Sequence, residues 1–332
     1  MCYYQPDYVK LIEYERNGLC EQVHNGIILH CNKNGIIKKA GEDNKCKFYH
    51  RSCMKPLQAA VFIDLGLDKM YELTDEEIAV CCGSHCGDLI HQEKVLSVLN
   101  KIGCSEEDLF CPAIAPLSKK EKERLFVLNL PYRKVHNNCS GKHALMLAIC
   151  KYKGFNIKNY TDLTHPLTEL VLNKVCNLCN TDIREVKISK DGCGLPVIAT
   201  TLEQLGMGFL NLFTNDKYKR IKNAFLKYPY LIGGEGRLDS EIINISDNLI
   251  SKVGACGLCV VVNLDKEECL VVKIADSGME ARSITVIEAL LQLKWPDVNK
   301  LSSGTLNNIY IKKIKSQNGE ILGEIRPCFS IS

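Results

Sequence analysis

Apolar residues recur along this chain with two different spacings. In residues 9–40, β-branched and aromatic residues form short extended runs that contain Asn-Gly dipeptides at Asn17, Asn25 and Asn34. Asn-Gly favours the tight turn of a β-hairpin, because both residues tolerate a positive φ. The pattern therefore predicts several β-strands in this region, with a turn at each dipeptide.

The spacing becomes helical between about residue 52 and residue 228. Thr74 and Glu77 form a capping box that begins one helix, and Pro166 begins another. Further helices are predicted at 91–101, 119–128, 139–151, 201–213 and 218–226.

Extended runs return near the C-terminus. The β-branched runs 258–262 and 269–274 flank an acidic turn and predict a hairpin, which is followed by a helix at 279–293. Two last extended segments are predicted at 307–314 and 320–326.

Strands at both ends of the chain, with helices between them, predict an α+β fold. In this fold one antiparallel sheet is built from the N- and C-terminal strands and is covered by helices. No linker-like stretch divides the sequence, so we expect residues 1–332 to form a single unit, with a helical segment at about 52–228 inserted between the sheet-forming ends.

Composition and charge exclude several classes of partner. With 46% hydrophobic and 24% charged residues, the chain has the composition of a globular protein. Its net charge of +3 is too small to indicate binding to nucleic acid. The longest apolar run, at 253–264, is too short to cross a bilayer, so we expect no membrane span. The N-terminus has no basic segment followed by an apolar core, which predicts a cytoplasmic location. The 19 cysteines are then expected to be thiols.

Ser52 and Lys55 stand three residues apart where a predicted helix begins, so their side chains share one helix face. A serine hydroxyl needs a base within hydrogen-bond reach to act as a nucleophile, and a neutral lysine amine is such a base. The partial positive charge of the first helical turn favours both the alkoxide and the free amine. The spacing fits serine–lysine catalysis; the alternative is that Ser52 caps the helix and Lys55 is solvated.

Lys55 acts as a base only if its pKa falls from about 10.4 toward about 7, which corresponds to about 4 kcal/mol. Burial and a second ammonium group both lower a lysine pKa. Lys273, within an otherwise apolar run, is a candidate for that second cation. The alternative is that Lys273 lies on an edge strand and that its side chain faces solvent.

Two cysteines from distant segments, Cys139 and Cys193, are candidate thiolate ligands of a zinc ion. Since lysine is rarely a metal ligand, the third ligand expected from residue type is His143, which lies one turn after Cys139 on the same helix face. The alternative is a pair of buried free thiols. The Cys-x-x-Cys pairs that begin at Cys176 and Cys256 lie in a predicted helix and before a predicted strand, without the turns of a zinc ribbon.

Six stretches occur in the order that is seen in one protein family. They are 51–58, 83–88, 137–144, 191–193, 233–237 and 271–278. With these motifs the chain resembles the Rhizobium-type L-asparaginases, also called class 3 asparaginases, from about residue 26 to residue 282. The most specific of them is Asn-Asn-Cys-Ser-Gly-Lys-His, which begins at Asn137.

The resemblance implies a fold similar to that of serine β-lactamases and serine glutaminases. It implies hydrolysis of the side-chain amide of L-asparagine to L-aspartate and ammonia, through an acyl-enzyme, by a homodimer. It also implies two catalytic pairs, which are Ser52 with Lys55 and Ser84 with Lys273.

Further residues follow from the same resemblance. Substrate binding is implied for Arg51, His85 and Asp191. A Zn²⁺ ion beside the pocket, which orients substrate rather than activating water, is implied for Cys139, Lys142 and Cys193. We follow the family in expecting Lys142, bound as a neutral amine, rather than His143 as the third ligand.

The chain departs from the family at three positions. Cys86 and Asp88 stand where asparagine and glutamate are usual, and Cys256 stands where an acidic residue is common. If these positions touch substrate, the preferred amide can differ from free asparagine. Glutaminase side activity, the oligomeric state and the need for zinc stay open at this point.

Two other classes of function are alternatives. One is a β-lactam-processing or penicillin-binding acyltransferase, against which stand the missing secretory signal and the missing Lys-Thr-Gly motif. The other is a cysteine-rich zinc or redox sensor without catalytic activity.

Overall fold

The computed structural model describes residues 5–295, 306, 309, 310 and 312–332. Its strands are β1 (Val9–Arg16), β2 (Leu19–Asn32), β3 (Gly35–Ala40), β4 (Phe48–Tyr49), β5 (Lys187–Lys190), β6 (Pro196–Thr200), β7 (Leu249–Gly254), β8 (Leu258–Asn263), β9 (Glu268–Ile274), β10 (Lys313–Lys315) and β11 (Ile321–Pro327). Its helices are α1 (Met54–Asp64), α2 (Leu67–Met70), α3 (Asp75–Cys82), α4 (Leu89–Lys101), α5 (Lys119–Val127), α6 (Ser140–Lys153), α7 (Pro166–Leu178), α8 (Leu202–Phe213), α9 (Lys219–Lys227), α10 (Pro229–Ile232), α11 (Leu238–Asn244) and α12 (Met279–Gln292).

The main sheet joins the two ends of the chain. Its strand order is β10-β11-β1-β2-β9-β8-β7, with β3 paired to β2, and every pairing is antiparallel. The helices from α1 to α11 lie in the sequence between the N-terminal and C-terminal strands. The predicted α+β class, with one antiparallel sheet covered by helices, is confirmed.

Alternation along β9 shows how the sheet is covered. Cys269 and Val271 belong to the large apolar core that includes α1, α6, α7 and α8, whereas Leu270 and Val272 belong to a second core that includes α12. Because successive side chains of a strand point to opposite faces, Lys273 points to the same face as Val271. Both faces are buried, which is why this strand is a nearly continuous apolar run.

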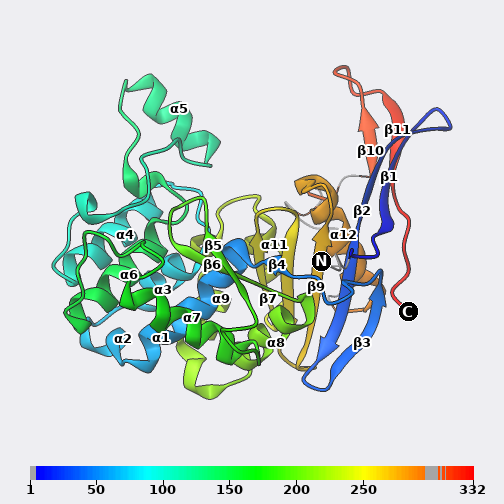
Figure 1. Ribbon diagram of the computed structural model, residues 1–332. Helices are drawn as coiled ribbons and strands as arrows, with labels where there is room; N and C mark the ends of the chain where they lie inside the picture. Colours follow the sequence, from blue (N-terminus) through cyan, green and yellow to red (C-terminus); the bar gives the residue numbers. More distant parts are fainter. Residues whose placement is uncertain (1–4, 296–305, 307–308, 311) are drawn as a thin grey trace.

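The helical lobe is built around α1. Every residue from Met54 to Phe62 is buried, so this helix has no solvent-facing side. A helix buried all round needs a mostly apolar sequence, and the exceptions in α1 are Lys55 in its first turn and Gln58. In Figure 1 the helices of this lobe gather on one side of the sheet, whereas α12 lies apart from them, and α5 stands at the edge of the lobe.

One predicted turn is wrong. The chain turns at Asn17-Gly18 and again between β2 and β3, but Asn25-Gly26 lies inside the long strand β2. Gly26 pairs with Val9 on one side and with Ile274 on the other. A Cβ at Gly26 would collide with the Lys273 carbonyl and lie 2.6 Å from Leu11. This glycine therefore permits the close approach of three strands.

The other elements largely follow the prediction, including the capping box between Thr74 and Glu77. The predicted extended segment 307–314 lies partly outside the described residues, and β10 begins at Lys313. A small second sheet has the order β4-β6-β5.

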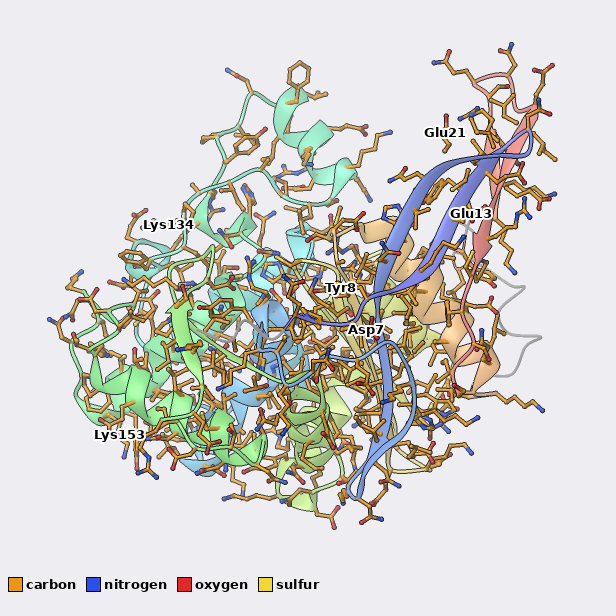
Figure 2. The ribbon with its side chains drawn as sticks, turned by 45° about the vertical axis from the view of Figure 1, so that its right-hand side comes forward. Asp7, Tyr8, Glu13, Glu21, Lys134 and Lys153 are labelled. Carbon is orange, nitrogen blue, oxygen red and sulfur yellow. The ribbon has the colours of Figure 1, made fainter. Side chains whose placement is uncertain are left out.

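The hairpin of β1 and β2 extends with β10 and β11 away from the helical lobe. Figure 2 shows Glu13 and Glu21 on this hairpin, whereas Lys134 and Lys153 lie on the helical side. Within the residues that the structure describes, no helix combines the length and apolar character that crossing a bilayer requires.

Candidate active site

Ser52 lies in a single 3₁₀ turn, Arg51–Cys53, that leads directly into α1. Arg51 has a φ of 49°, in the left-handed region that a residue with a long side chain rarely adopts. Backbone strain of this kind persists only where the surrounding structure holds it, and it is frequent at functional sites. The Ser52 side chain is partly exposed, and within the described part of the chain its hydroxyl has no hydrogen-bond partner.

Lys55 is buried and held by three polar groups. Its Nζ lies 2.9 Å from the Gly83 carbonyl oxygen, 3.0 Å from Ser84 Oγ and 2.7 Å from the Asn138 carbonyl oxygen. Backbone carbonyls only accept hydrogen bonds, so a neutral amine donates its two N–H groups to them. Its lone pair is then left facing Ser84 Oγ. The structure thus brings Lys55 and Ser84 together as a base and a hydroxyl.

Burial lowers the pKa of Lys55 to about 8. The positive charges of Lys142 and Lys252 contribute to this lowering, whereas the thiolate forms of Cys139 and Cys193 oppose it. Lys273, the cation that we expected from the sequence, is not among the main causes of this shift. The cations that help to lower the pKa of Lys55 are therefore Lys142 and Lys252.

Lys252 was missed at the level of sequence. It lies in β7, is fully buried, and forms a 2.9 Å ion pair with the buried Asp239. The sequence clue is a lysine within the largely apolar stretch 249–254, an argument that we applied to Lys273 alone. Ile250, two residues earlier, belongs to the core of the helical lobe, so Lys252 faces that lobe.

Ser84 follows α3 in a tight loop. Its backbone N–H donates to the Ile232 carbonyl oxygen at 2.8 Å, and a Cβ at Gly83 would lie 2.6 Å from the same oxygen. The glycine lets this loop press against the end of α10, which places the Ser84 hydroxyl against Lys55. Ser84 is buried, with 3% of its surface exposed.

Lys273 lies on the sheet face that carries the helical lobe, and its Nζ donates to the Ile274 carbonyl oxygen at 2.5 Å. Burial lowers its pKa, against the opposing charges of Cys256 and Asp276. No hydrogen bond joins Lys273 to Ser84 among the described residues, so the second Ser–Lys pair stays a prediction.

The predicted substrate-binding residues separate into two groups. Arg51 Nε donates to Asp191 Oδ1 at 2.7 Å, and Arg51 Nη1 lies 3.1 Å from Cys256 Sγ. His85, by contrast, is fully buried, and its Nε2 lies 3.0 Å from Ser140 Oγ. Asp191 is thus held by Arg51, the residue that precedes Ser52, whereas His85 supports the loop of Ser84 from its buried side.

The predicted zinc ligands converge next to this group. Lys142 Nζ donates to Cys193 Sγ at 3.1 Å, and it lies 4.0 Å from Asp191 Oδ2. A hydrogen bond from Cys139 lowers the pKa of Cys193 to about 5, against burial and with the help of the Lys142 charge. Two thiols and one amine therefore lie together here, and they are the donor set that would hold a zinc ion.

His143 points elsewhere. Its Nδ1 is 2.7 Å from the hydroxyl of Tyr160. The geometry therefore favours Lys142 over His143 as the third ligand. Against the effect of burial, the charges of Cys193, Cys139 and Asp191 raise the pKa of Lys142 above its ordinary value, so its amine would have to lose a proton in order to bind zinc. Cys176 and Cys179 are buried in the apolar core of the helical lobe.

A pocket of about 760 Å³ opens on the loop that follows Ser84, and neither Ser52 nor Ser84 is among its lining residues. It is lined by residues of the 86–90 segment, of α5 and its flank, and by Tyr230, Glu235 and Arg237. It touches the Lys55 site only through Cys86, two residues after Ser84.

Comparison with known proteins establishes the family. The model of the L-asparaginase II family matches residues 12–327, which is nearly the whole chain. The chain belongs to this family and is therefore an asparaginase-type amidohydrolase that acts on a small molecule. No curated protein matches the chain.

Solved structures with a similar fold include two β-lactamases. One, from Mycobacterium bovis, has 15% sequence identity and a TM-score of 0.43, and the match covers 82% of this chain and 95% of that one. The other, a putative β-lactamase from Bacteroides dorei, has 13% identity and a TM-score of 0.41, with 79% and 92% covered. At these scores the two structures carry no argument about this protein.

Proposed function

We propose that this protein hydrolyses the side-chain amide of L-asparagine to L-aspartate and ammonia through an acyl-enzyme on Ser52. Lys55 is the base, and Ser84 relays protons between Lys55 and the reacting groups. The observation that carries the proposal is the buried contact of 3.0 Å between Lys55 Nζ and Ser84 Oγ, with two carbonyls holding the remaining amine hydrogens.

Ser52 is the proposed nucleophile because its hydroxyl is partly exposed and has no hydrogen-bond partner within the described residues. When Ser52 attacks the amide carbon, its proton moves to Ser84 Oγ while the Ser84 proton moves to neutral Lys55. The ammonium of Lys55 then returns a proton by the same path to the leaving nitrogen, which departs as ammonia. Water cleaves the acyl-enzyme by the reverse sequence. Backbone N–H groups near Ser52 are the proposed oxyanion donors.

Charge complementarity supports an amino-acid substrate. Arg51 and Asp191 form an ion pair of 2.7 Å beside Ser52 and offer one group of each sign. We propose that Arg51 binds the substrate carboxylate and Asp191 its ammonium group. Cys256 touches Arg51, so this cysteine is the departure from the family that bears most directly on substrate choice. We expect weak or absent activity on glutamine.

We propose that Cys139, Lys142 and Cys193 hold a Zn²⁺ ion. When bound, zinc supplies a fixed positive charge that orients substrate. Without it, the Lys142 ammonium provides the positive charge between Cys193 and Asp191. In addition to binding the substrate ammonium group, Asp191 then holds the Lys142 ammonium near Arg51.

Serine variants test the mechanism. Ser52→Ala should lower the rate of aspartate release by about 10³-fold or more, and Ser84→Ala by about 10²-fold to 10⁴-fold. Mass spectrometry of the rapidly quenched enzyme should show a covalent adduct in Ser84→Ala and none in Ser52→Ala. Ser283→Ala is the matched control, since this buried hydroxyl bonds to Met279 on α12, away from the site.

The opposite pattern would move the nucleophile. If Ser52→Ala keeps its adduct and Ser84→Ala loses it, Ser84 attacks the substrate directly. Assays with asparagine, glutamine, small peptides and a chromogenic cephalosporin separate the asparaginase proposal from a different amide substrate and from β-lactam chemistry.

We also propose that the chain forms a homodimer. Phe126, Val127 and Leu128, at the end of α5, are exposed by 87%, 78% and 55%. Neighbouring exposed apolar side chains are typical of an interaction surface. Light scattering should give twice the chain mass of 37.2 kDa, and Phe126→Ser with Val127→Ser should give a monomer. Leu19→Ser, an exposed position on the distant hairpin, is the control; a monomeric native protein would end this proposal.

A further inference from the structure

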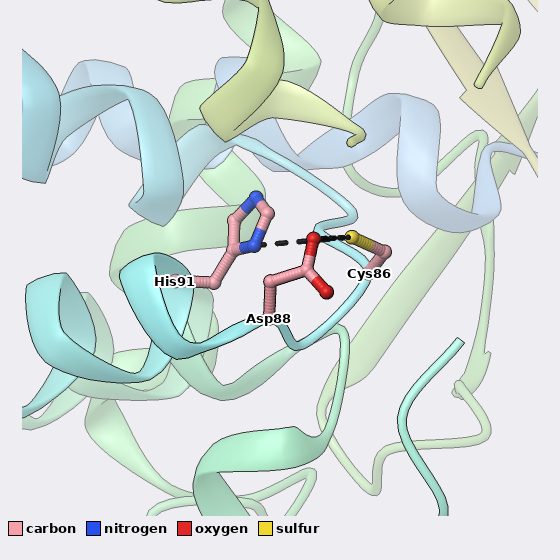
Figure 3. A group of neighbouring side chains, drawn as sticks. All are labelled: Cys86, Asp88 and His91. Carbon is pink, nitrogen blue, oxygen red and sulfur yellow. Dashed lines mark hydrogen bonds between the residues drawn. The ribbon is translucent and has the colours of Figure 1, made fainter. Parts of the chain in front are cut away.

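A second group of metal-binding side chains lies outside the predicted zinc site. Cys86, Asp88 and His91 each present one ligand atom, and these atoms lie within 4.8 Å of one another. This is the one cluster of three or more His, Cys, Asp or Glu side chains that the described residues place so closely. Figure 3 shows the thiol, the carboxylate and the imidazole facing one another across the loop that precedes α4.

The distances approach those of a metal site. Cys86 Sγ lies 3.0 Å from Asp88 Oδ2 and 3.9 Å from His91 Nδ1. For a tetrahedral zinc ion, with bonds of about 2.3 Å to sulfur and about 2.0 Å to nitrogen or oxygen, these separations are about 3.5 Å. A shift of about half an ångström in each separation would therefore accommodate the ion.

His91 is already oriented as a ligand. Its Nε2 lies 3.1 Å from the Tyr230 carbonyl oxygen, which can only accept, so Nε2 carries the proton and Nδ1 offers its lone pair. Metal-binding histidines commonly donate their other N–H to a carbonyl in this way. The imidazole is also held between the rings of His85 and Tyr230, at centroid distances of 5.1 Å and 5.3 Å.

Asp88 is fixed as well, because the hydroxyl of Tyr230 donates to its Oδ2. On the other side, Gly234 packs against Cys86, and a Cβ there would collide with the thiol. Cys86 and Asp88 both line the pocket of about 760 Å³, which supplies an entry path from solvent and an open coordination position.

We propose that Cys86, Asp88 and His91 bind a divalent transition metal ion, Zn²⁺ by the chemistry of the donor set, with a fourth position open to the pocket. Sulfur, imidazole and carboxylate ligands together are typical of zinc rather than of magnesium or calcium. On binding, the Cys86 thiol loses its proton to solvent as the metal–sulfur bond forms. Since the loop also carries Ser84, the metal fixes the position of that hydroxyl against Lys55.

The test must separate this site from the Cys139–Lys142–Cys193 site. In the double variant Cys139→Ser, Cys193→Ser, equilibrium dialysis against Zn²⁺ should still give one ion per chain. Adding Cys86→Ser should remove that ion, and Asp88→Asn should weaken its binding by about 10-fold or more. Cys328→Ser, at an exposed cysteine, is the control and should leave the metal content unchanged.

Co²⁺ provides a second readout that does not depend on activity. The double variant loaded with Co²⁺ should show one thiolate charge-transfer band, and Cys86→Ser should abolish it. If the double variant does not fold, as judged by circular dichroism, the comparison uses the native chain, in which Cys86→Ser should lower the Co²⁺ and Zn²⁺ content by one ion. A metal content that is unaffected by Cys86→Ser, or the absence of metal from the folded double variant, would overturn the proposal.

Discussion

The pKa of Lys55 makes a quantitative prediction about the pH dependence of catalysis. Burial moves this pKa from 10.5 to about 8, so at pH 7 about one molecule in ten carries the neutral amine instead of about one in 3,000. The shift corresponds to about 3 kcal/mol of differential stabilisation of the neutral form. If neutral Lys55 is the base, kcat/KM should rise about tenfold between pH 7 and pH 9 and then level off.

The assay measures aspartate release by a coupled reaction from pH 6 to pH 10, which avoids the ionisation of the ammonia product. A second variant tests the cause of the shift. Replacing Lys252 and Asp239 together by Met and Asn removes a nearby positive charge without leaving a buried carboxylate unpaired. Because Lys252 lowers the Lys55 pKa, the rising limb should move to higher pH in this variant.

Two results would refute this reasoning. A profile without a rising limb between pH 7 and pH 9 would show that Lys55 does not need to lose a proton. A rise in kcat/KM only near pH 10.5 would show that the buried environment does not lower the pKa of Lys55.

Two further predictions concern stability. The pKa of Lys55 is lower in the folded than in the unfolded state, so burying its charge destabilises the fold fully below pH 8, and this cost is lost as pH rises toward 10.5. The free energy of unfolding of the native chain, relative to Lys55→Met, should therefore increase by about 2 to 3 kcal/mol from pH 7 to pH 10. A difference that does not change with pH in urea titrations would contradict this. Gly141→Ala should destabilise the protein by about 1 to 3 kcal/mol, because the added methyl would lie 2.8 Å from the backbone carbonyl carbon of Val80. Gly208→Ala, whose methyl would meet the side chain of Cys179 at 2.7 Å, should cost less; equal melting temperatures for the native chain and Gly141→Ala would exclude the backbone clash.

Local pattern was sufficient for most of the fold. The hairpin of β8 and β9, the capping box at Thr74 and the helix that follows Cys139 were all predicted, because hydrophobic spacing, caps and turn residues act over a few positions. The sheet formed by both chain ends also followed from the order of these elements. Asn25-Gly26 was mistaken for a turn, since only the pairing partners on both sides show that the strand continues.

The motifs likewise located the candidate site in the sequence, but the tertiary structure decided which groups meet. The sequence spacing paired Lys55 with Ser52, whereas packing of the 83–84 loop against α10 brings Lys55 to Ser84. The effect of Lys252 on Lys55 could not be found from spacing, because it depends on burial and on a charge that a distant segment contributes. Cys86, Asp88 and His91 are close in the sequence, but only the fold shows that their ligand atoms face one another. Most secondary-structure elements, the family and the types of reactive residue can therefore be read from the amino-acid order alone. Only the fold decided the protonation of Lys55 and the contacts of these groups, because desolvation and through-space charge act between segments that are not neighbours in the chain.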